Sequence, residues 1–307
     1  MRRLAHVLVL LAILPLPSHA YFELTNIGAR TVALGPSAMS YVDDASAYHW
    51  NPAALATLPG PEVLLDLSRP HGVDNLSENA LALGARRWGT GWTAAWHRTA
   101  VAEVYAEDLF CLSAGRTLLR TPGGSQLDAG ATFKFGRAGF QPFEIPGGTV
   151  VDYGVVSKGS LDAGIRWRTP WNIDVAWVSR DLLQPRYEFG AGSGGDRLPA
   201  RQEVAAAFRW NRESTISVGR TQSIRGDVAL SAGMEILFFD VFAIRSGLSN
   251  LSSTFESTSS PNDLQFSGGF GVFHRGIQID AAAGTNHDLG ASYRVTLRVR
   301  PGSREAR

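Results

Sequence analysis

The side chains that could do acid–base, nucleophilic or metal chemistry are few in this sequence, and they are scattered. The seven histidines occur singly, and two of them, His6 and His19, lie among the first twenty residues. Metal-binding and protease spacings of His, Glu and Cys are absent, as are nucleophile-elbow and phosphate-loop patterns. The single cysteine, Cys111, cannot form an internal disulfide. We therefore expect a protein that is not an enzyme and has no catalytic residues, cofactor or metal site. A hydrolase whose Ser, His and acid meet at one rim of the fold is the alternative.

Polar and aromatic residues are concentrated in one short motif inside an alanine-rich stretch. Two aspartates could hold a cation, but an aspartate before such a stretch is more typical of a helix cap. The proline interrupts or restarts the helix. The motif predicts a short helix of small residues that suits the filling of an interior space, and a plain amphipathic helix outside any pore is the alternative. The residues to which we assign a role in plugging or ligand gating are Asp43, Asp44, Trp50, Asn51, Pro52 and Ala53.

Other charged residues alternate with apolar ones along the chain. Lys134 stands between two phenylalanines, and residues 161–168 and 291–299 alternate strictly between apolar and polar side chains. This period of two is typical of β-strands with two different faces. An arginine that faces lipid near the membrane midplane costs about 2–4 kcal/mol, so the charged face should line an interior. The predicted lumen-lining residues are Lys134, Asp162, Arg166, Arg168, Arg294 and Arg298.

The positioning elements are fourteen segments of alternating polarity, and helical periodicity is nearly absent after Leu58. Many of them are about nine to twelve residues long, which suits strands that cross a bilayer at a tilt rather than strands of soluble proteins. The predicted strands are 62–68, 79–88, 91–99, 107–117, 126–137, 158–169, 171–180, 201–210, 214–222, 227–238, 240–249, 263–274, 276–284 and 289–299.

The links between these segments alternate between mostly tight and mostly long. The tight ones are rich in turn residues, whereas the links at 69–78, 138–157, 181–200 and 250–262 are long and rich in Gly, Ser, Pro and Asp. Membrane barrels place short turns in the periplasm and long loops outside. An even number of strands brings both termini to the turn side. The sequence therefore predicts an all-β fold, a 14-stranded antiparallel transmembrane β-barrel with a short N-terminal helical plug.

The N-terminus and the composition fix the compartment and the domain boundaries that we expect. Residues 1–20 combine Arg2 and Arg3 with an apolar run and a small-residue cleavage site, as signal peptides do. We predict a plug at 21–60, the barrel at 61–300 and a tail at 301–307. A net charge of +1 provides no field that would attract nucleic acid, so none is expected as a partner.

The opening of the mature chain resembles PorV/PorQ-type proteins and, more distantly, FadL-type outer-membrane transporters. The matching stretches are Gly28-Ala29-Arg30, Leu34-Gly35, residues 43–47 and residues 50–55. The resemblance implies a plugged outer-membrane barrel that contacts lipid and binds or passes hydrophobic small molecules. The alternative that it implies is a non-enzymatic partner of a secretion system, with a secreted protein as ligand.

Two features depart from that family. Ala54 stands where the family usually has glycine, and the chain ends in residues 300–307 without the aromatic residue that closes many barrels. An exported soluble sandwich is a third alternative to the two membrane interpretations.

Overall fold

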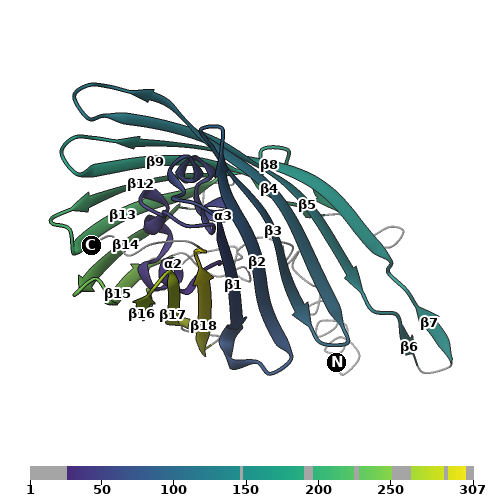
Figure 1. The fold of residues 1–307 in the computed structure, drawn as a ribbon. Coiled ribbons are helices and arrows are strands. Elements are labelled where there is room, and N and C mark those ends of the chain that lie inside the picture. The colour runs from purple at the N-terminus through teal and green to yellow at the C-terminus, as the bar shows by residue number, and fades with distance from the viewer. Residues whose placement is uncertain are drawn as a thin grey trace, which may run out of the picture.

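A closed barrel of fourteen antiparallel strands forms the molecule (Figure 1). The computed structural model describes residues 26–145, 148–189, 196–224, 228–250, 264–286 and 290–301. The wall strands are β1 (Glu62–Arg69), β2 (Leu76–Arg87), β3 (Thr90–Val101), β4 (Tyr105–Arg120), β5 (Gln126–Phe140), β8 (Val155–Arg168), β9 (Ile173–Arg180), β12 (Arg201–Arg209), β13 (Ser214–Ser223), β14 (Val228–Phe238), β15 (Phe242–Ser249), β16 (Gln265–His274), β17 (Ile277–Asn286) and β18 (Gly290–Val299).

The first and last strands close the wall. β1 pairs with β18 in an antiparallel register that runs from Val63 opposite Val299 to Arg69 opposite Tyr293. On its other side β1 pairs with β2. This closure leaves neither terminal strand with an open edge. The predicted 14-stranded antiparallel barrel is confirmed, and each predicted segment overlaps one wall strand.

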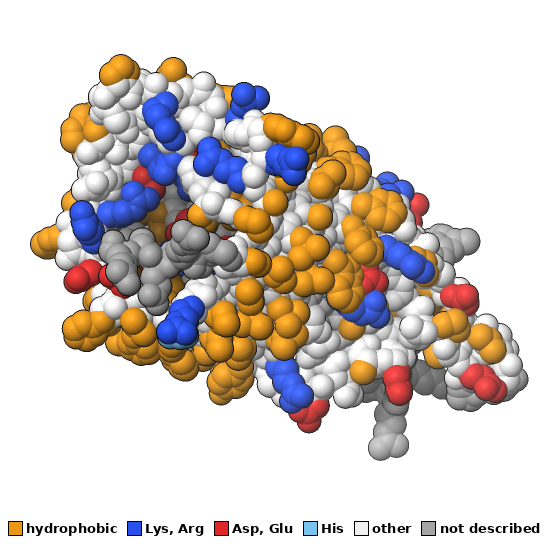
Figure 2. Space-filling model, viewed as in Figure 1, with side chains coloured by type: hydrophobic (Ala, Val, Ile, Leu, Met, Phe, Trp, Pro, Cys, Tyr) orange, Lys and Arg blue, Asp and Glu red, His pale blue; other side chains and the backbone are white. Residues whose placement is uncertain are grey.

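Alternation of polarity divides the wall into two faces. On β14 the outward side chains include the exposed Leu230 and Met234, and on β18 they include Tyr293 and Val295. Figure 2 shows hydrophobic side chains gathered over the outer surface of the strands. The other face is turned inward, and many of its charged side chains are buried. An apolar outside and a polar inside are what a barrel in a bilayer requires.

Short links join the strands at one end of the barrel, which we call the turn end; examples are 88–89, 169–172 and 275–276. The opposite, loop end carries longer links that hold two small hairpins, β6 (Phe143–Ile145) with β7 (Thr149–Val151) and β10 (Arg186–Tyr187) with β11 (Asp196–Arg197). Some loop-end links, such as 102–104, are short, so the alternation is not strict.

The wall is taller on one side than on the other. β4, β5 and β8 have 16, 15 and 14 residues, whereas β9 and β15 have eight each. β9 pairs with β8 only at residues 163–168 of β8. In its loop-end half, β8 is therefore paired with a wall strand on one side only, and that strand is β5. The tall sector continues into the β6–β7 hairpin, which projects from the body in Figure 1. The barrel therefore has a high rim on one side and a low rim on the other.

Residues 26–60, which we call the inner segment, lie inside the barrel (Figure 1). They form α2 (Ala29–Leu34), η1 (Pro36–Ser40), α3 (Ala47–Trp50) and η2 (Pro52–Thr57). No helix in the described ranges has the length and apolar character needed to cross a membrane. The predicted signal peptide at 1–20 and nearly all of the tail at 301–307 lie outside the described residues.

Candidate binding site inside the barrel

Glycines of the wall shape the surface against which the inner segment packs. A Cβ added at Gly115 or Gly130 would overlap the carbonyl group of Pro52, and one at Gly91 would overlap that of Leu55. On the opposite wall, a Cβ at Gly233 would overlap the carbonyl oxygen of Leu34. Only glycine permits backbone to approach backbone this closely. The inner segment is therefore moulded to strands on several sides of the lumen.

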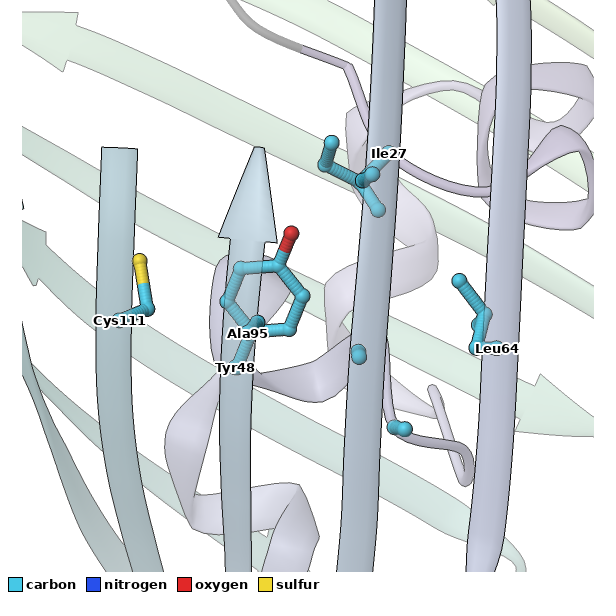
Figure 3. Packing of buried hydrophobic residues seen from close by; sticks show 8 residues of the cluster. Ile27, Tyr48, Leu64, Ala95 and Cys111 are labelled. Carbon is cyan, nitrogen blue, oxygen red and sulfur yellow. The ribbon is translucent and has the colours of Figure 1, made fainter. Parts of the chain in front are cut away.

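Aromatic and apolar side chains hold the inner segment from within. Figure 3 shows Tyr48 of α3 among Ile27 and the wall residues Leu64, Ala95 and Cys111, all of which are buried. Trp50 donates its indole N–H to the carbonyl of Ile27 at 2.7 Å. Cys111, the single cysteine, thus belongs to the inward face of β4.

The Asn-Pro motif forms a helix cap within the inner segment. The Asn51 Oδ1 atom accepts a hydrogen bond from the backbone N–H of Ala53 at 3.0 Å and caps η2, which begins at Pro52. The expectation that Asp43 or Asp44 caps the helix is wrong. Ser46 occupies the N-cap position of α3 without a side-chain cap, and Asp44 instead accepts from the N–H of Ser46 in the turn before it. Pro52 does restart the helix, because α3 ends at Trp50.

Several of the inward charges that the sequence singles out are buried in ion pairs. Arg166, which is 2 % exposed, lies 3.1 Å from a carboxylate oxygen of Asp128 and donates to the carbonyl of Val42. Arg168 lies 3.6 Å from the same carboxylate and is less buried. These contacts link the wall to the inner segment and to itself.

The last strand is tied to the N-terminal part of the chain by its arginines. Arg298 pairs with Asp44 at 3.0 Å, and Arg294 pairs with both Asp66 of β1 and Glu78 of β2. Asp43, whose side chain is 55 % exposed, pairs with Arg30 of α2. Both aspartates of the motif are therefore occupied by arginines rather than arranged around a cation. Among the described residues no group of His, Cys, Asp and Glu is placed to hold a metal ion.

A pocket lies between α3 and the loop end of the wall. The inner segment contributes Tyr48, His49 and Trp50, and the hairpin link contributes Tyr187 and Leu198. The wall and its edge contribute most of the charged side chains, which are Lys134, Lys158, Asp162, Arg180, Asp181, Arg201 and Glu203. Pro52 does not line it, because it packs against the wall glycines nearer the turn end.

Most charges in this pocket neutralise one another. Lys134 bridges Asp162, at 2.7 Å, and Asp181. Arg180 binds Glu203 through two hydrogen bonds of 2.8 and 2.9 Å and also donates to the carbonyls of His49 and Trp50. Burial of a charge destabilises a protein less when an opposite charge lies beside it and its hydrogen-bonding groups have partners, as they do here.

Some groups outside the wall strands have shifted pKa values in this setting, His49 and Asp181 among them. Burial, reinforced by the positive charge of Arg180, lowers the pKa of His49 well below its usual range, so His49 is neutral at pH 7. Burial alone would raise the pKa of Asp181, but Lys134 and Arg201 outweigh it and lower this pKa. The pocket thus keeps Asp181 ionised.

Sequence reasoning missed Arg180, Asp181, Arg201 and Glu203, which dominate the pocket, and also Arg245, which binds Glu235 and Asp280. The signal was present for the strand residues. Arg180 and Glu203 fall on the inward face once the registers of β9 and β12 are counted. Arg201 shares the face of Glu203, two residues away on β12, whereas Asp181 follows the end of β9, where alternation gives no face to a side chain.

The fold is similar to that of several solved proteins, among them a transporter and a channel. A FadL homologue of Pseudomonas aeruginosa matches with a TM-score of 0.60 and 11% identity over 91% of this chain and 99% of that one. The Pseudomonas putida toluene transporter TodX matches with a TM-score of 0.61 and 13% identity over 91% and 98%. The monoaromatic hydrocarbon channel CymD matches with a TM-score of 0.56 and 12% identity over 89% and 97%.

The similarity is one of structure and not of sequence. No protein-family model matches the chain, and no curated protein sequence matches it. The structural neighbours therefore show the fold of the barrel, and they assign neither a ligand nor residue roles to this chain.

Proposed function

We propose that this protein is an outer-membrane barrel that binds hydrophobic small molecules at its loop end and passes them around the inner segment, which acts as a plug. The observation that carries the proposal is the arrangement of the lumen. A moulded inner segment fills its turn-end part, and a pocket remains above it, beside Tyr48 and Trp50. A barrel with an apolar outer face supports placement in the outer membrane, with lipid as its surroundings.

Similar proteins of known structure support the class of cargo. Two of the structural neighbours are described as a toluene transporter and a monoaromatic hydrocarbon channel. On this proposal the protein is a non-enzymatic transporter without cofactor, and the gating residues are Asp43, Asp44, Trp50, Asn51, Pro52 and Ala53. The lumen-lining role of Lys134, Asp162, Arg166, Arg168, Arg294 and Arg298 is part of the same proposal.

The narrower resemblance to PorV/PorQ-type proteins, and with it a secreted-protein partner, stays a prediction. The long links at 138–157 and 181–200 would supply such a surface, but Tyr187 and Leu198 of the second link pack inward against the wall. This inward packing supports a role at the pocket more than a role in holding a protein outside.

Uptake by whole cells tests the proposal. Gram-negative cells that lack their own channels of this class and express the protein should take up labelled toluene or oleate faster than cells with the empty vector. Deletion of residues 21–56 should change the rate. Uptake equal to that of the empty vector, with folded protein present in the outer membrane, would contradict the proposal.

A cross-link provides a second test that does not depend on a deletion. The hydroxyl oxygens of Ser37 on η1 and Ser217 on β13 are 2.8 Å apart. Ser37→Cys with Ser217→Cys, in a Cys111→Ala background, should form a disulfide that fixes the inner segment to the wall. We expect slower uptake in the oxidised state and recovery after reduction. Equal rates in both states would exclude movement of this part of the plug.

A further inference from the structure

Basic side chains on the outer surface gather at the turn end of the barrel. In Figure 2 many Lys and Arg side chains lie toward the upper left, which is the side of the short turns in Figure 1. Arg87, Arg116, Arg212 and Arg275 are exposed at this end. Among the described residues none of these four arginines takes part in an ion pair, so their charges are available to a partner.

Two of these arginines lie at the same height on the outward face of the wall. Thr90 of β3 pairs with Arg87 of β2 on one side and with Arg116 of β4 on the other. Arg116 is four residues from Leu112 and shares its outward face. Residues paired across strands project from the same face, and two strand spacings separate their backbones by about 10 Å. The two guanidinium groups therefore flank Thr90 on the outside of the barrel.

Outward arginines indicate where the hydrocarbon of a surrounding bilayer ends. An arginine on the lipid face costs about 2–4 kcal/mol at the bilayer midplane but only about 0–1 kcal/mol near the interface. Arg87 and Arg116 are therefore compatible with a membrane only if this end of β2 and β4 lies at the level of the headgroups. Guanidinium groups placed there meet lipid phosphates, which they bind through paired hydrogen bonds.

Tryptophans at the turns indicate the same level. Trp88, Trp171 and Trp210 are all exposed, and Trp88 is the most exposed of the three at 81 %. The guanidinium group of Arg87 lies over the ring of Trp88, 5.0 Å from its centroid. Tryptophan is enriched where hydrocarbon meets headgroups, because its ring is largely apolar and its N–H group is polar.

The arrangement around the barrel favours a lipid leaflet over a protein as the partner. The turns that carry these arginines and tryptophans join β2 to β3, β8 to β9, β12 to β13 and β16 to β17, and the strand order distributes them around the closed wall. A protein docked on one side would contact few of these turns, whereas a leaflet surrounds them all. The outward face that continues from the turns is apolar, as contact with lipid requires.

The balance of charge selects the kind of lipid. The acids of the short turns are Glu213 and Asp240, fewer than the exposed arginines of the same end. At the loop end, by contrast, exposed acids such as Asp74, Glu103 and Asp152 are interspersed with the basic side chains. A basic residue near a membrane surface gains about 1 kcal/mol from anionic lipid. The turn end is therefore suited to anionic headgroups.

We propose that Arg87 and Arg116, with Trp88 beside them, form a binding site for the phosphate of an anionic phospholipid in the leaflet at the turn end. Arg212 and Arg275 add to the attraction farther around the barrel. This inference rests on the membrane placement within the proposed function, and it does not depend on which molecule passes through the lumen.

Quenching of tryptophan fluorescence by brominated lipids tests the proposal on the full chain folded in vesicles. Brominated phosphatidylglycerol should bind to the protein surface about fivefold more tightly than brominated phosphatidylcholine, because one arginine near the membrane surface contributes about 1 kcal/mol. High salt should lower this ratio, since the arginines are exposed.

Substitutions assign the preference to the site. Arg87→Gln combined with Arg116→Gln should lower the ratio at least about twofold, because both charges flank one headgroup position. Arg87→Lys with Arg116→Lys should retain more of it. Arg186→Gln is the matched control, because Arg186 is exposed at the loop end and pairs with Glu188, and it should leave the ratio unchanged. Heat-modifiable gel mobility verifies that each variant is folded.

Equal binding of the two lipids would overturn this inference and would favour a soluble acidic partner for the arginines. A preference that Arg87→Gln with Arg116→Gln leaves unchanged would also overturn it. These results are separable from the uptake experiment. Lipid preference without uptake would contradict transport and keep the headgroup site, and uptake without lipid preference would do the reverse.

Discussion

Single inward charges in this barrel are stabilised by specific partners, and Arg166 is the clearest case. It is almost fully buried, and its partner Asp128 is 0 % exposed. Removal of one member of a buried pair leaves the other uncompensated, which is far more costly than removal of both. The pair therefore makes each residue dependent on the other rather than adding much net stability.

Replacement of Arg166 should expose this dependence. We expect Arg166→Met to lower the free energy of unfolding in detergent by about 3 kcal/mol, at the low end for a buried pair, because Arg168 also lies near Asp128. Denaturant titration measures the change. Arg166→Met combined with Asp128→Leu should recover part of the loss, and Arg212→Ala should cause none. A double variant less stable than the single one would refute the pairing argument.

Low pH should destabilise the rim of the barrel, because Asp181 loses its negative charge there. Its pKa is lower in the folded protein than the ordinary value near 3.8, because Lys134 and Arg201 outweigh the effect of burial. The ionised form thus contributes stability above about pH 4, and this contribution is lost as pH falls through the lowered folded value.

Comparison of wild type with Asp181→Asn at several pH values checks this prediction. The variant should be less stable at pH 7, and the difference should shrink as the pH falls below about 4 toward the lowered pKa of folded Asp181. Asp152→Asn is the control, because Asp152 is exposed and its acceptor oxygen for the N–H of Gly154 persists in asparagine. A difference that stays constant with pH would show that the charge of Asp181 is not what matters.

At the scale of elements, alternation along the chain was enough to predict the wall strands, because a one-residue slip would turn every charged side chain toward lipid. Their ends were harder to predict. β4 runs to Arg120 although its predicted segment ends at Thr117, since strand pairing continues past the point where alternation fails. The pocket also depended on Asp181, which follows the end of β9, so a face pattern could not reveal the whole of it.

Docking of the inner segment onto wall glycines is a second property of elements. Gly130→Ala should destabilise the barrel by about 1–3 kcal/mol, because its methyl group would overlap Pro52. Urea unfolding in detergent gives the magnitude, and limited proteolysis reports whether the inner segment is released.

Gly159→Ala is the matched control for this substitution. Gly159 also lies in a strand, but an added Cβ there would have its nearest neighbours at 3.7 Å, on the Phe133 ring. This variant should be neutral or slightly more stable, because glycine weakens a strand interior. Equal behaviour of the two variants would mean that the wall does not constrain the inner segment.

The whole molecule unites an apolar outer belt, a paired and charged interior and an asymmetric rim. The belt followed from sequence, since exposed residues such as Leu112 and Leu230 alternate with inward polar ones. The height difference of the rim did not, because segment lengths alone do not say where a strand leaves the membrane. A pair of substitutions can therefore test which part of the tall sector lies within the membrane.

Arginine introduced at two exposed apolar positions should disturb folding at one of them and not at the other. Leu112 lies near the middle of β4 and is 57 % exposed on the outer face, whereas Val150, at 65 %, lies on the β6–β7 hairpin beyond the tall rim. Within hydrocarbon an arginine costs about 2–4 kcal/mol near the midplane and almost nothing at the surface. Leu112→Arg should thus reduce folding into lipid vesicles, measured by heat-modifiable gel mobility, and Val150→Arg should fold as wild type does. Because both changes replace one exposed aliphatic side chain by the same charge, only lipid contact distinguishes them, and equal folding of the two variants would remove the outer face of β4 from the membrane.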